Sequence, residues 1–491
     1  MGCGGSTSRA TEKKKTVPEP IPVLGYWNIQ ARGDPARLLL HHLGVKFEDK
    51  QYVFGETSGP KSWSANKTKL GMVIPNLPYW KDGDVIHAET VPVLKSICRK
   101  YCPTYMGRTQ AEQAAADSFA STIYGGLLGF FMPYMFRADY AEKKEEGLEA
   151  AKGYLDLIER CIGSKRFIAG NEPTYADFIT YWILKVLKMY APTIFDGRQA
   201  VTYMRNFTAL KGIQTAENAY KDVPPFLPLC NWWKDRMPGA KAPAKPTPAQ
   251  APAKPTPSQA PAKPTPAQAP AKPTPALASA KPITAPEVKG PKPILGYWGI
   301  QGRGDPCRML LHNLGVDFED KHYVMGETSG ENSWPANKGQ LGTPFPNLPY
   351  WKDGDIIHSE TIPVIRSICR KYKPEYMGRN QTEQAYADSF TGTINGAFVP
   401  WFMPHMFRED YASKRVEGTA KGKELAEMIV NCLGNKKFIA GNDITYVDFV
   451  SFWLLKILNL YDKSIVGSFP KLGQYMELFS SQKGITEAAK A

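Results

Sequence analysis

The chain has 491 residues, with 61 Lys and Arg against 47 Asp and Glu, so its formal net charge is +14 at pH 7. Residues 1–20 carry a net +2 and residues 241–293 a net +7, which leaves +5 for the rest, and this mild remainder argues against a nucleic-acid partner. No stretch approaches the ~18 uninterrupted apolar residues of a membrane helix, and the first residues lack the apolar core of a secretory signal.

The first six residues read MGCGGS. Met-Gly-x-x-x-Ser is the pattern for N-myristoylation, here of Gly2. One myristoyl chain holds a membrane only weakly, but Cys3 offers a site for palmitoylation and Lys13–Lys15 would be attracted to acidic headgroups. We therefore expect attachment to the cytoplasmic face of the plasma, ciliary or flagellar membrane, and otherwise a cytoplasmic location. A chance match to so short a motif is the alternative.

The first folded segment begins with VLGYW at 23–27, which is expected to form a strand. DPARLLLHHLG at 34–44 predicts a helix, with Asp34 as a cap, Pro35 in the first turn and Gly44 as the stop.

Three more strands and a second helix follow. FEDKQYVF at 47–54 predicts a strand, and NLPYW and DVIH predict two strands around the turn KDGD. ETVPVLKSICRKY at 89–101 predicts a helix, so the order is βαβ and then ββα. The next 110 or so residues have helical periodicity only, and TYAD at 174–177 predicts a capping box in which Thr174 bonds the third amide and the acid reaches back.

A proline-rich segment from Ala242 to Leu277 contains four variants of APAKPTPAQ. Prolines at every second or third position prevent both helix and sheet, and favour polyproline II at about 3.1 Å per residue. The segment therefore predicts a semi-rigid spacer that reaches roughly 110 Å when extended. A ligand for an SH3-type domain is the alternative.

The chain then repeats itself. VLGYWNIQARGDPARLLLHHLGV at 23–45 returns as ILGYWGIQGRGDPCRMLLHNLGV at 294–316, and FIAGNEPTYADF at 167–178 returns as FIAGNDITYVDF at 438–449. The offset is 271 throughout, without gaps. Two copies of about 200 residues are too long for solenoid repeats and predict a tandem pair of whole folding units, called here the first and second copy.

The eight cysteines include no CxxC pair and no accompanying histidine cluster. This arrangement argues against a zinc site. It is typical of free thiols in a reducing compartment.

Four motifs occur in the same order in both copies: GYW followed by RGDPxR, the loop SWxxNK, the segment PNLPY and the box TYxDF. Together they resemble the cytosolic glutathione S-transferases, closest to the mu class, over essentially the full length of each copy. The resemblance implies an α/β plus all-α fold, in which each copy has a thioredoxin-like N-terminal domain and an all-helical C-terminal domain. The expected divisions are 1–21 (acylated basic arm), 22–104 and 105–238 (first copy), 239–291 (linker), and 292–375 and 376–491 (second copy).

The resemblance also implies a reaction, with glutathione as substrate and no metal. The hydroxyls of Tyr26 and Tyr297 would donate a hydrogen bond to the glutathione sulfur, which favours the thiolate and lowers its pKa. Lowering the pKa of this thiol by two requires about 2.7 kcal/mol of preferential stabilisation of the thiolate. Arg32 and Arg303 stand where the mu class has an apolar residue and where the alpha and sigma classes place an arginine near the sulfur. A surface position at a helix start is their alternative role.

Other motifs imply the remaining contacts with glutathione. Trp63 and Lys67, with their counterparts in the second copy, match residues that bind the glycine carboxylate, although the tryptophans would also suit packing. The residues before the expected cis-prolines, Pro78 and Pro349, would bind the cysteinyl part through their backbone. The full set of expected glutathione-binding residues is Trp27, Trp63, Lys67, Asn76, Leu77, His87, Glu89, Asp117, Trp298, Trp334, Lys338, Asn347, Leu348, His358, Ser359, Glu360 and Asp388.

The two copies differ at one of these positions. His358-Ser359 is expected to begin a helix and to offer a hydroxyl and free amides to the γ-glutamyl carboxylate. The first copy has His87-Ala88 and lacks the hydroxyl. A hydrogen bond to a charged group is worth roughly 1.5–3 kcal/mol, so we expect the first copy to bind glutathione more weakly.

Further matches concern the family's dimer. Asp117 and Asp388 match an acidic residue that reaches across the dimer toward the γ-glutamyl amine, with a solvated helix charge as the alternative. Phe345 stands at the place of an aromatic key that enters the partner subunit, and the first copy has Ile74 there. We therefore expect an intramolecular pseudo-dimer or a homo-oligomer.

Two functions from different classes are compatible with these features. The first is a membrane-tethered glutathione transferase that acts on hydrophobic electrophiles, in detoxification or in lipid-peroxide or prostaglandin-type chemistry. The second is a non-catalytic structural or carrier protein that keeps the fold, as lens crystallins of this family do. The paired tyrosines, arginines and Asn-Leu-Pro segments favour the first.

Overall fold

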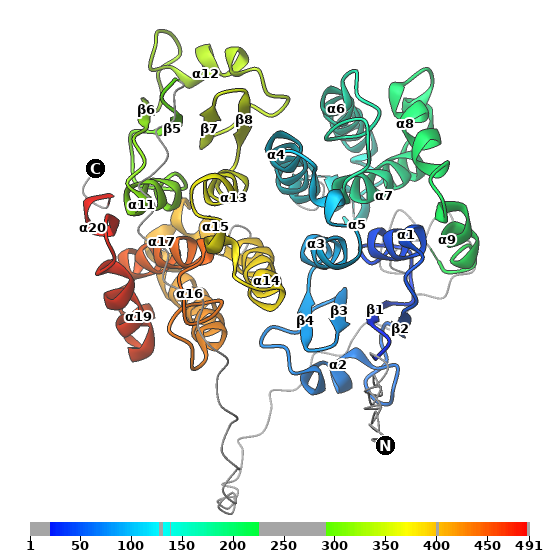
Figure 1. The fold of residues 1–491 in the computed structure, drawn as a ribbon, viewed down its shortest axis with the longest axis horizontal. Helices are drawn as coiled ribbons and strands as arrows, with labels where there is room; N and C mark the ends of the chain where they lie inside the picture. Colours follow the sequence, from blue (N-terminus) through cyan, green and yellow to red (C-terminus); the bar gives the residue numbers. More distant parts are fainter. Residues whose placement is uncertain (1–19, 127–130, 138, 225–290, 399–401, 489–491) are drawn as a thin grey trace, which may run out of the picture.

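The structure contains two copies of one folding unit, which lie side by side in Figure 1. Gly2, Cys3 and the Ala242–Leu277 repeats, on which several expectations rest, lie outside the described residues. The structure is a computed structural model that describes residues 20–126, 131–137, 139–224, 291–398 and 402–488.

Each copy begins with a four-stranded sheet, in the order β2-β1-β3-β4 in the first copy and β6-β5-β7-β8 in the second. The first two strands of each copy are parallel, and the other neighbours are antiparallel. This is the expected βαβ-ββα arrangement of a thioredoxin-like domain. The strands are β1 (Val23–Trp27), β2 (Glu48–Tyr52), β3 (Tyr79–Asp82), β4 (Val85–Ala88), β5 (Ile294–Trp298), β6 (Glu319–Tyr323), β7 (Tyr350–Asp353) and β8 (Ile356–Ser359).

The helix after the first strand, α1 (Asp34–Leu43), begins and ends for local reasons. Pro35 stands in its first turn, and Gly44 ends it with a left-handed φ of 66°. The expectation that Asp34 caps this helix is wrong. Gly33 is the capping residue, and the Asp34 carboxylate accepts a hydrogen bond from Arg37 at 3.1 Å.

Helices make up the rest of each copy, as the periodicity predicted. Over the described residues no strand follows β4 in the first copy or β8 in the second. The main helices of the first copy are α3 (Thr90–Tyr101), α4 (Gln110–Phe119), α5 (Met132–Phe136), α6 (Lys144–Ile162), α7 (Tyr175–Tyr190), α8 (Gln199–Thr208) and α9 (Ile213–Ala219). Those of the second are α11 (Asp305–Leu314), α13 (Thr361–Tyr372), α14 (Gln381–Ala397), α15 (Met403–Met406), α16 (Tyr411–Leu433), α17 (Tyr446–Tyr461), α18 (Lys463–Gly467), α19 (Pro470–Ser480) and α20 (Ile485–Ala488).

The central helix of each helical domain starts with the expected capping box. The Thr174 box opens α7, and the Thr445 box opens α17. In the second copy the buried Asp448 carboxylate accepts hydrogen bonds from the backbone of Ile439 and Thr445 and from the Tyr475 hydroxyl, at 2.8 to 3.0 Å. One carboxylate thus ties the start of the helix to a loop and to α19.

Replacing this carboxylate is expected to destabilise the second copy. Asp448→Ala leaves several buried donors without an acceptor, at about 1–3 kcal/mol each, so we expect the free energy of unfolding in urea to fall by about 3 kcal/mol or more. Asp317→Ala removes an aspartate whose side chain is 86% exposed and serves as the control. Equal urea unfolding curves for the two variants would show that the box does not stabilise the fold.

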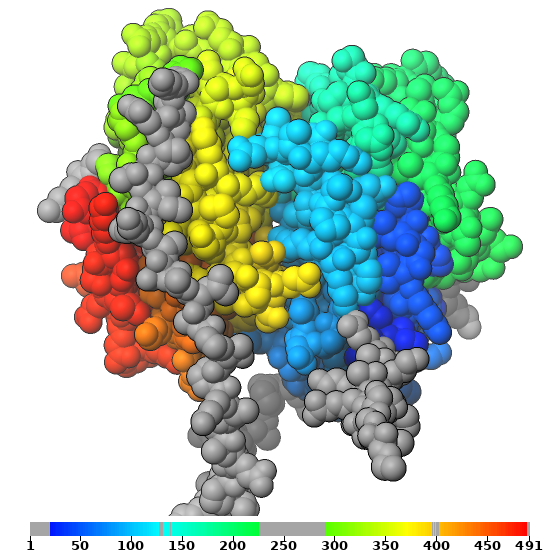
Figure 2. Space-filling view, viewed as in Figure 1, coloured from blue at the N-terminus to red at the C-terminus, as the bar shows by residue number. Residues whose placement is uncertain are grey.

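The two copies contact each other mainly through α4 and α14. α4 of the first copy packs against β8 and α13 of the second, and α14 packs in the same way against β4 and α3. In Figure 2 the light-blue surface of the first copy meets the yellow surface of the second. Phe345 is buried in the core of the first copy beside Phe119, with ring centroids 6.5 Å apart, and Ile74 packs against the core of the second.

In the described ranges no helix has both the length and the apolar character needed to cross a bilayer.

Candidate active site

Tyr26 lies on β1, and two glycines leave room for its ring and for the neighbouring ring of Tyr79. A Cβ added to Gly33 would lie 2.5 Å from that ring, and a Cβ on Gly25 would lie 2.0 Å from the ring of Tyr79. Such distances are shorter than carbon atoms tolerate, so both positions require glycine. The second copy repeats this arrangement around Tyr297.

The hydroxyls of both tyrosines meet a backbone donor. The amide of Arg32 donates to the Tyr26 hydroxyl at 3.0 Å, and the amide of Arg303 donates to the Tyr297 hydroxyl at 2.9 Å. Burial raises the pKa of both phenols above the usual value, so both are protonated at neutral pH. Because the amide occupies an acceptor site of the oxygen, the hydroxyl proton is left for another acceptor.

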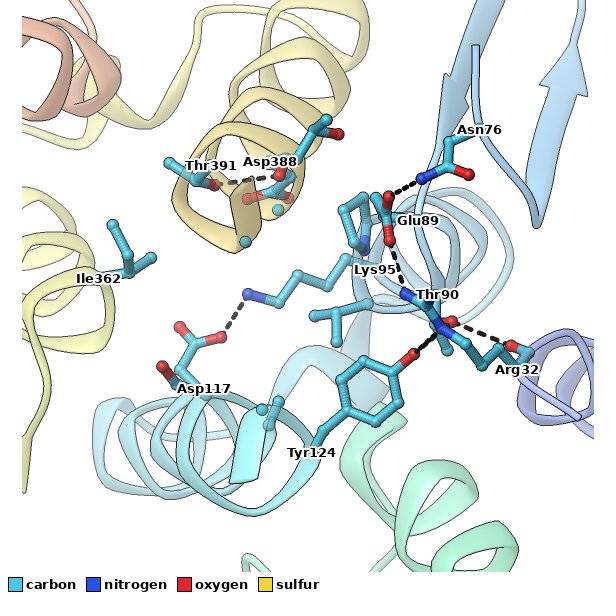
Figure 3. A pocket seen from close by; sticks show the side chains of 18 of the residues that line it. Arg32, Asn76, Glu89, Thr90, Lys95, Asp117, Tyr124, Ile362, Asp388 and Thr391 are labelled. Carbon is cyan, nitrogen blue, oxygen red and sulfur yellow. Dashed lines mark hydrogen bonds and ion pairs between the residues drawn. The ribbon is translucent and has the colours of Figure 1, made fainter. Parts of the chain in front are cut away.

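The side chain of Arg32 contacts two groups at a pocket between the copies (Figure 3). Its Nη2 lies 2.9 Å from the Glu89 carboxylate, and its Nε donates to the Tyr124 hydroxyl at 2.9 Å. Tyr124 donates in turn to the Thr90 hydroxyl, which donates to the backbone oxygen of Arg32. The guanidinium is therefore held in one place, beside the loop that contacts Tyr26.

In the second copy the arginine lies farther from the equivalent carboxylate than it does in the first. Arg303 lies 3.5 Å from the Glu360 carboxylate. Thr361 donates to the backbone oxygen of Arg303 at 2.8 Å, as Thr90 does in the first copy. The residue that corresponds to Tyr124 is Asn395, which lacks a ring. The two candidate sites are thus similar in backbone but differ around the arginine.

The Asn-Leu-Pro segments lie at the edge of each site. The Leu77–Pro78 and Leu348–Pro349 peptide bonds are cis. In the first copy Asn76 donates to the Glu89 carboxylate and accepts from the amide of Leu77 at 2.9 Å. Asn347, Leu348 and Glu360 repeat these contacts in the second copy.

The expected helix start at His358-Ser359 is wrong by two residues. Both residues belong to strand β8, and the helix begins at Thr361, after Glu360 with its left-handed φ of 78°. The Ser359 hydroxyl accepts from the amide of Asn347 at 3.3 Å. The first copy has Ala88 at this position and therefore lacks the side-chain hydrogen bond to its Asn-Leu-Pro segment. The expectation of weaker glutathione binding by the first copy stays a prediction, on this different basis.

The two histidines are buried between the copies and away from the tyrosines. Burial lowers the pKa of His87 and of His358 to about 4, so both are neutral at pH 7. Among the described residues neither ring has a side-chain hydrogen-bond partner, and each lies near the backbone of a proline, Pro92 or Pro363. The structure therefore does not bring them together with Tyr26 or Tyr297.

The expected carboxylate-binding pairs lie at the ends of the sheets. Trp63 stacks on Tyr79, with ring centroids 6.2 Å apart, and Trp334 stacks on its counterpart Tyr350 in the same way. The packing role considered for these tryptophans is thus present. Lys67 and Lys338 are exposed in the turn that follows each tryptophan, and Trp27 and Trp298 are half-buried at the ends of β1 and β5.

Asp117 and Asp388 face each other across the boundary between the copies. Both line the pocket of about 400 Å³ that also contains Arg32 and Glu89. They are buried, which argues against the solvated role considered as the alternative.

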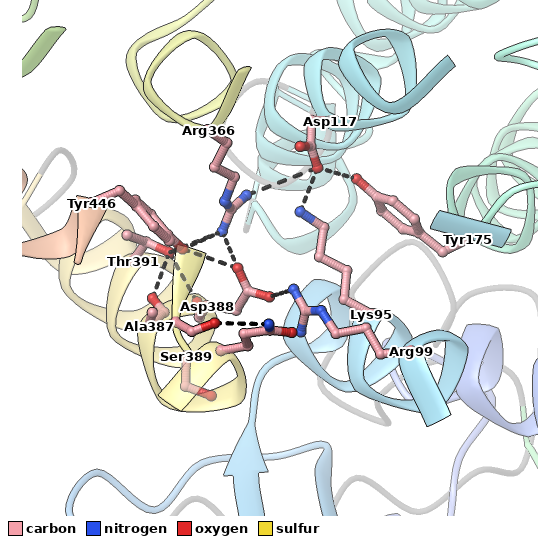
Figure 4. Close-up of polar contacts among 12 residues, drawn as sticks. Lys95, Arg99, Asp117, Tyr175, Arg366, Ala387, Asp388, Ser389, Thr391 and Tyr446 are labelled. Carbon is pink, nitrogen blue, oxygen red and sulfur yellow. Dashed lines mark hydrogen bonds and ion pairs between the residues drawn. The ribbon is translucent and has the colours of Figure 1, made fainter. Parts of the chain in front are cut away.

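An ion-pair network surrounds these two carboxylates (Figure 4). Arg99 of the first copy pairs with Asp388, and Arg370 of the second pairs with Asp117. Within each copy Lys95 pairs with Asp117 and Arg366 with Asp388, and tyrosines donate to both carboxylates: Tyr175 at 2.6 Å to Asp117 and Tyr446 at 2.9 Å to Asp388.

The charges of this network oppose the effect of burial on the pKa values of the two carboxyl groups. Burial alone would raise the pKa of each carboxyl, but Arg370 and Lys95 hold the pKa of Asp117 well below its usual value, and Arg99 and Arg366 do the same for Asp388. Burial and the neighbouring Arg366 lower the pKa of Lys95 to about 8. Four cations therefore share two ionised carboxylates at neutral pH.

Sequence reasoning missed several of these residues: Thr90, Lys95, Arg99, Tyr124, Arg366 and Arg370. The cations occupy positions 271 residues apart in the two copies. This repetition is the sequence signal that could have identified them. No pattern along the sequence showed that Arg99 and Arg370 would each pair with an aspartate of the other copy. Among the described residues no cluster of three or more His, Cys, Asp or Glu side chains could hold a metal ion.

Comparisons with known proteins match the two copies separately. Models described as "Glutathione S-transferase, C-terminal domain" match residues 141–210 and residues 404–490. The glutathione S-transferase of Tyrophagus putrescentiae is 34% identical over 206 residues, which are 41% of this chain and 90% of that protein. Glutathione S-transferase Mu 6 of Mus musculus is 30% identical over 212 residues, 42% of this chain and 94% of that protein.

A solved structure also matches one copy. It is that of the glutathione S-transferase Blo t 8, which is 25% identical, with a TM-score of 0.38 over 42% of this chain and 98% of that chain. As with the curated relatives, the matched length is that of a single copy.

Proposed function

The chain belongs to the glutathione S-transferase family and is a glutathione transferase; from that premise we propose that Tyr26 and Tyr297 each hold the glutathione sulfur as a thiolate. The observation that carries the proposal is the pair of buried, protonated phenols. Each accepts a backbone N–H and so has its own proton left to donate. The thiolate then attacks a hydrophobic electrophile.

Arg32 and Arg303 supply positive charge near the sulfur in this proposal. Each follows its tyrosine by six residues, and its backbone amide contacts the phenol oxygen. A cation close to a thiolate favours the charged form and lowers the pKa of the thiol. We propose an enzyme that is mu-like in its SWxxNK loop and departs from that class at these two arginines.

We further propose that the second copy is the faster site. Arg32 is engaged by both Tyr124 and Glu89, whereas the contact of Arg303 with Glu360 is longer, at 3.5 Å. A guanidinium that is less engaged has more positive potential to offer the sulfur. Tyr297→Phe is therefore expected to remove more than half of the conjugating activity, and Tyr26→Phe less than half. Equal losses in steady-state assays would contradict this ranking.

Binding of the rest of glutathione is assigned to the edges of each site. Trp63 with Lys67, and the same pair in the second copy, would take the glycine carboxylate, and the Asn-Leu backbone the cysteinyl part. For the γ-glutamyl part we propose the first turn of α3 and of α13, because these helices begin after Glu89 and Glu360. Asp388 faces the first copy's pocket and would pair there with the γ-glutamyl amine.

We propose that the two copies of one chain pair with each other in solution. Phe345 of the second copy lies in the core of the first, and Ile74 of the first copy packs against the core of the second. Arg99 and Arg370 each form an ion pair across the boundary. Sedimentation at micromolar concentration is expected to give the mass of one chain, and a mass of two chains would contradict the pairing.

The location of the enzyme is also a proposal, supported by the first fifteen residues. Gly2, Cys3 and Lys13–Lys15 together offer the two signals that stable membrane anchoring needs. Gly2→Ala is expected to abolish acylation and to move the chain from the membrane fraction to the soluble fraction. Gly5→Ala, at a variable position of the motif, is the control. Mass spectrometry of the native amino terminus would contradict the proposal if Gly2 carried no acyl group.

The reaction is tested by conjugation of glutathione to a generic aryl halide. The wild-type chain is expected to conjugate well above the uncatalysed rate. Absence of both catalysis and glutathione binding would leave the structural or carrier role, for which the doubling and the long spacer are the supporting features.

A further inference from the structure

The Phe345 contact and the Ile74 contact occupy equivalent positions between the copies. They differ in the size of the side chain that each one contains. Phe345 places a phenyl ring beside Phe119 and is only 8% exposed. At the equivalent place of the other contact stands Ile74, whose side chain has three fewer carbon atoms and is half-buried. One contact therefore contains a phenyl ring, and the equivalent contact contains a smaller aliphatic side chain.

A pocket of about 180 Å³ lies at this second contact. Its walls come from both copies, with Val73 and Ile74 from the first and Tyr386, Phe390 and Cys432 from the second. Phe390 is the counterpart of Phe119, the residue that the Phe345 ring touches in the other contact. The pocket thus has an aromatic wall of the kind that already receives a phenyl ring in this molecule.

One buried polar side chain on the pocket wall keeps an acceptor for a ligand. His87 is 3% exposed, and among the described residues its ring has no full hydrogen bond, with only the backbone of Pro92 close to one nitrogen. Its ring is neutral at pH 7, since burial lowers its pKa to about 4, so one nitrogen is an acceptor. His358 in the other contact is buried in the same way, near the backbone of Pro363. The feature that distinguishes the two contacts is therefore the smaller residue beside the pocket.

We propose that this pocket binds one small neutral aromatic molecule of the size of a phenol, with its ring against Phe390 and its hydroxyl donating to His87. An apolar cavity of about 150 Å³ is large enough for benzene, so the size is sufficient. The exposed Asp84 at the rim disfavours anions. Neither Tyr26 nor Tyr297 lines the pocket, so it is distinct from the proposed glutathione sites.

The test uses the full chain with 4-fluorophenol as the probe, followed by fluorine NMR. The wild type is expected to bind one equivalent, and saturating glutathione is expected to leave this binding unchanged. Ile74→Phe should fill the pocket and abolish binding. Leu460→Phe, which makes the same kind of change at a side chain that is 77% exposed, is the control and should bind as the wild type does.

A second variant tests the hydrogen bond and does not depend on filling the pocket. The wild type is expected to prefer 4-fluorophenol to 4-fluorotoluene by about tenfold, because only the phenol satisfies the buried acceptor. His87→Phe should remove this preference. The proposal is overturned if the wild type does not bind the probe, if glutathione displaces it, or if a folded Ile74→Phe or His87→Phe chain retains the wild-type affinity and preference.

Discussion

Changing Tyr26 and Tyr297 together to phenylalanine is expected to lower kcat/KM for glutathione conjugation about 10- to 150-fold. The change removes the proposed donor to the thiolate, and a hydrogen bond to a charged group is worth about 1.5–3 kcal/mol, or a factor of ten for each 1.4 kcal/mol. The ring and its packing against Gly33 remain. The loss should be smaller above the pKa of free glutathione, near pH 8.5, where the thiol ionises without help.

A matched control is available in the same chain. Tyr105 and Tyr376 are also 271 residues apart, and their hydroxyls contact His42 and Asn313, away from the candidate sites. Their double change to phenylalanine removes two hydroxyls and should leave kcat/KM within a factor of two or so of the wild type. If both double variants conjugate equally well, Tyr26 and Tyr297 do not activate the thiol.

Asp388→Asn is expected to destabilise the chain by about 3–5 kcal/mol. The change leaves Arg99 of one copy and Arg366 of the other without their shared carboxylate, and breaking a buried ion pair by removing one partner has this cost. The free energy of unfolding in urea, without glutathione, measures the effect. Asp443→Asn breaks the exposed pair with Arg379 and should cost less than about 1 kcal/mol.

The same network predicts an acid limit to stability. The pKa values of Asp117 and Asp388 are lower in the folded chain than the unfolded value of about 3.9. Their contribution is therefore complete above about pH 4 and is lost as the pH falls below it. Wild-type stability should drop steeply there, and Asp388→Asn should show a shallower decrease. Parallel pH profiles would show that Asp388 does not contribute to this limit.

The sequence was sufficient for the strands and helices because their signals are local. A few neighbouring residues specify each structure: VLGYW for a strand, Pro35 and Gly44 for the two ends of α1, and the TYxD boxes for helix starts. The helix start at Ser359 was misplaced because the polar pair His-Ser resembles a cap. In the structure the helix begins after Glu360, which has a positive φ. No residue pattern predicts this conformation for a glutamate.

The site was predictable only in part, because its charges are completed across the two copies. Tyr26 and Arg32 are six residues apart, and one motif contains both. Arg99 and Asp388 are 289 positions apart, and each alone reads as an ordinary helix charge. Their pairing follows from the packing of α3 against α14, which depends on tertiary contacts and not on any local signal.

A phenol that stabilises the glutathione thiolate must lower the pKa of the bound thiol. An ultraviolet absorbance titration of the thiolate of bound glutathione measures this pKa directly. We expect a midpoint about two pH units below that of free glutathione, equivalent to about 2.7 kcal/mol, and a return toward the free value when both tyrosines become phenylalanine. A midpoint in the wild-type complex equal to that of free glutathione would contradict this role of the phenol.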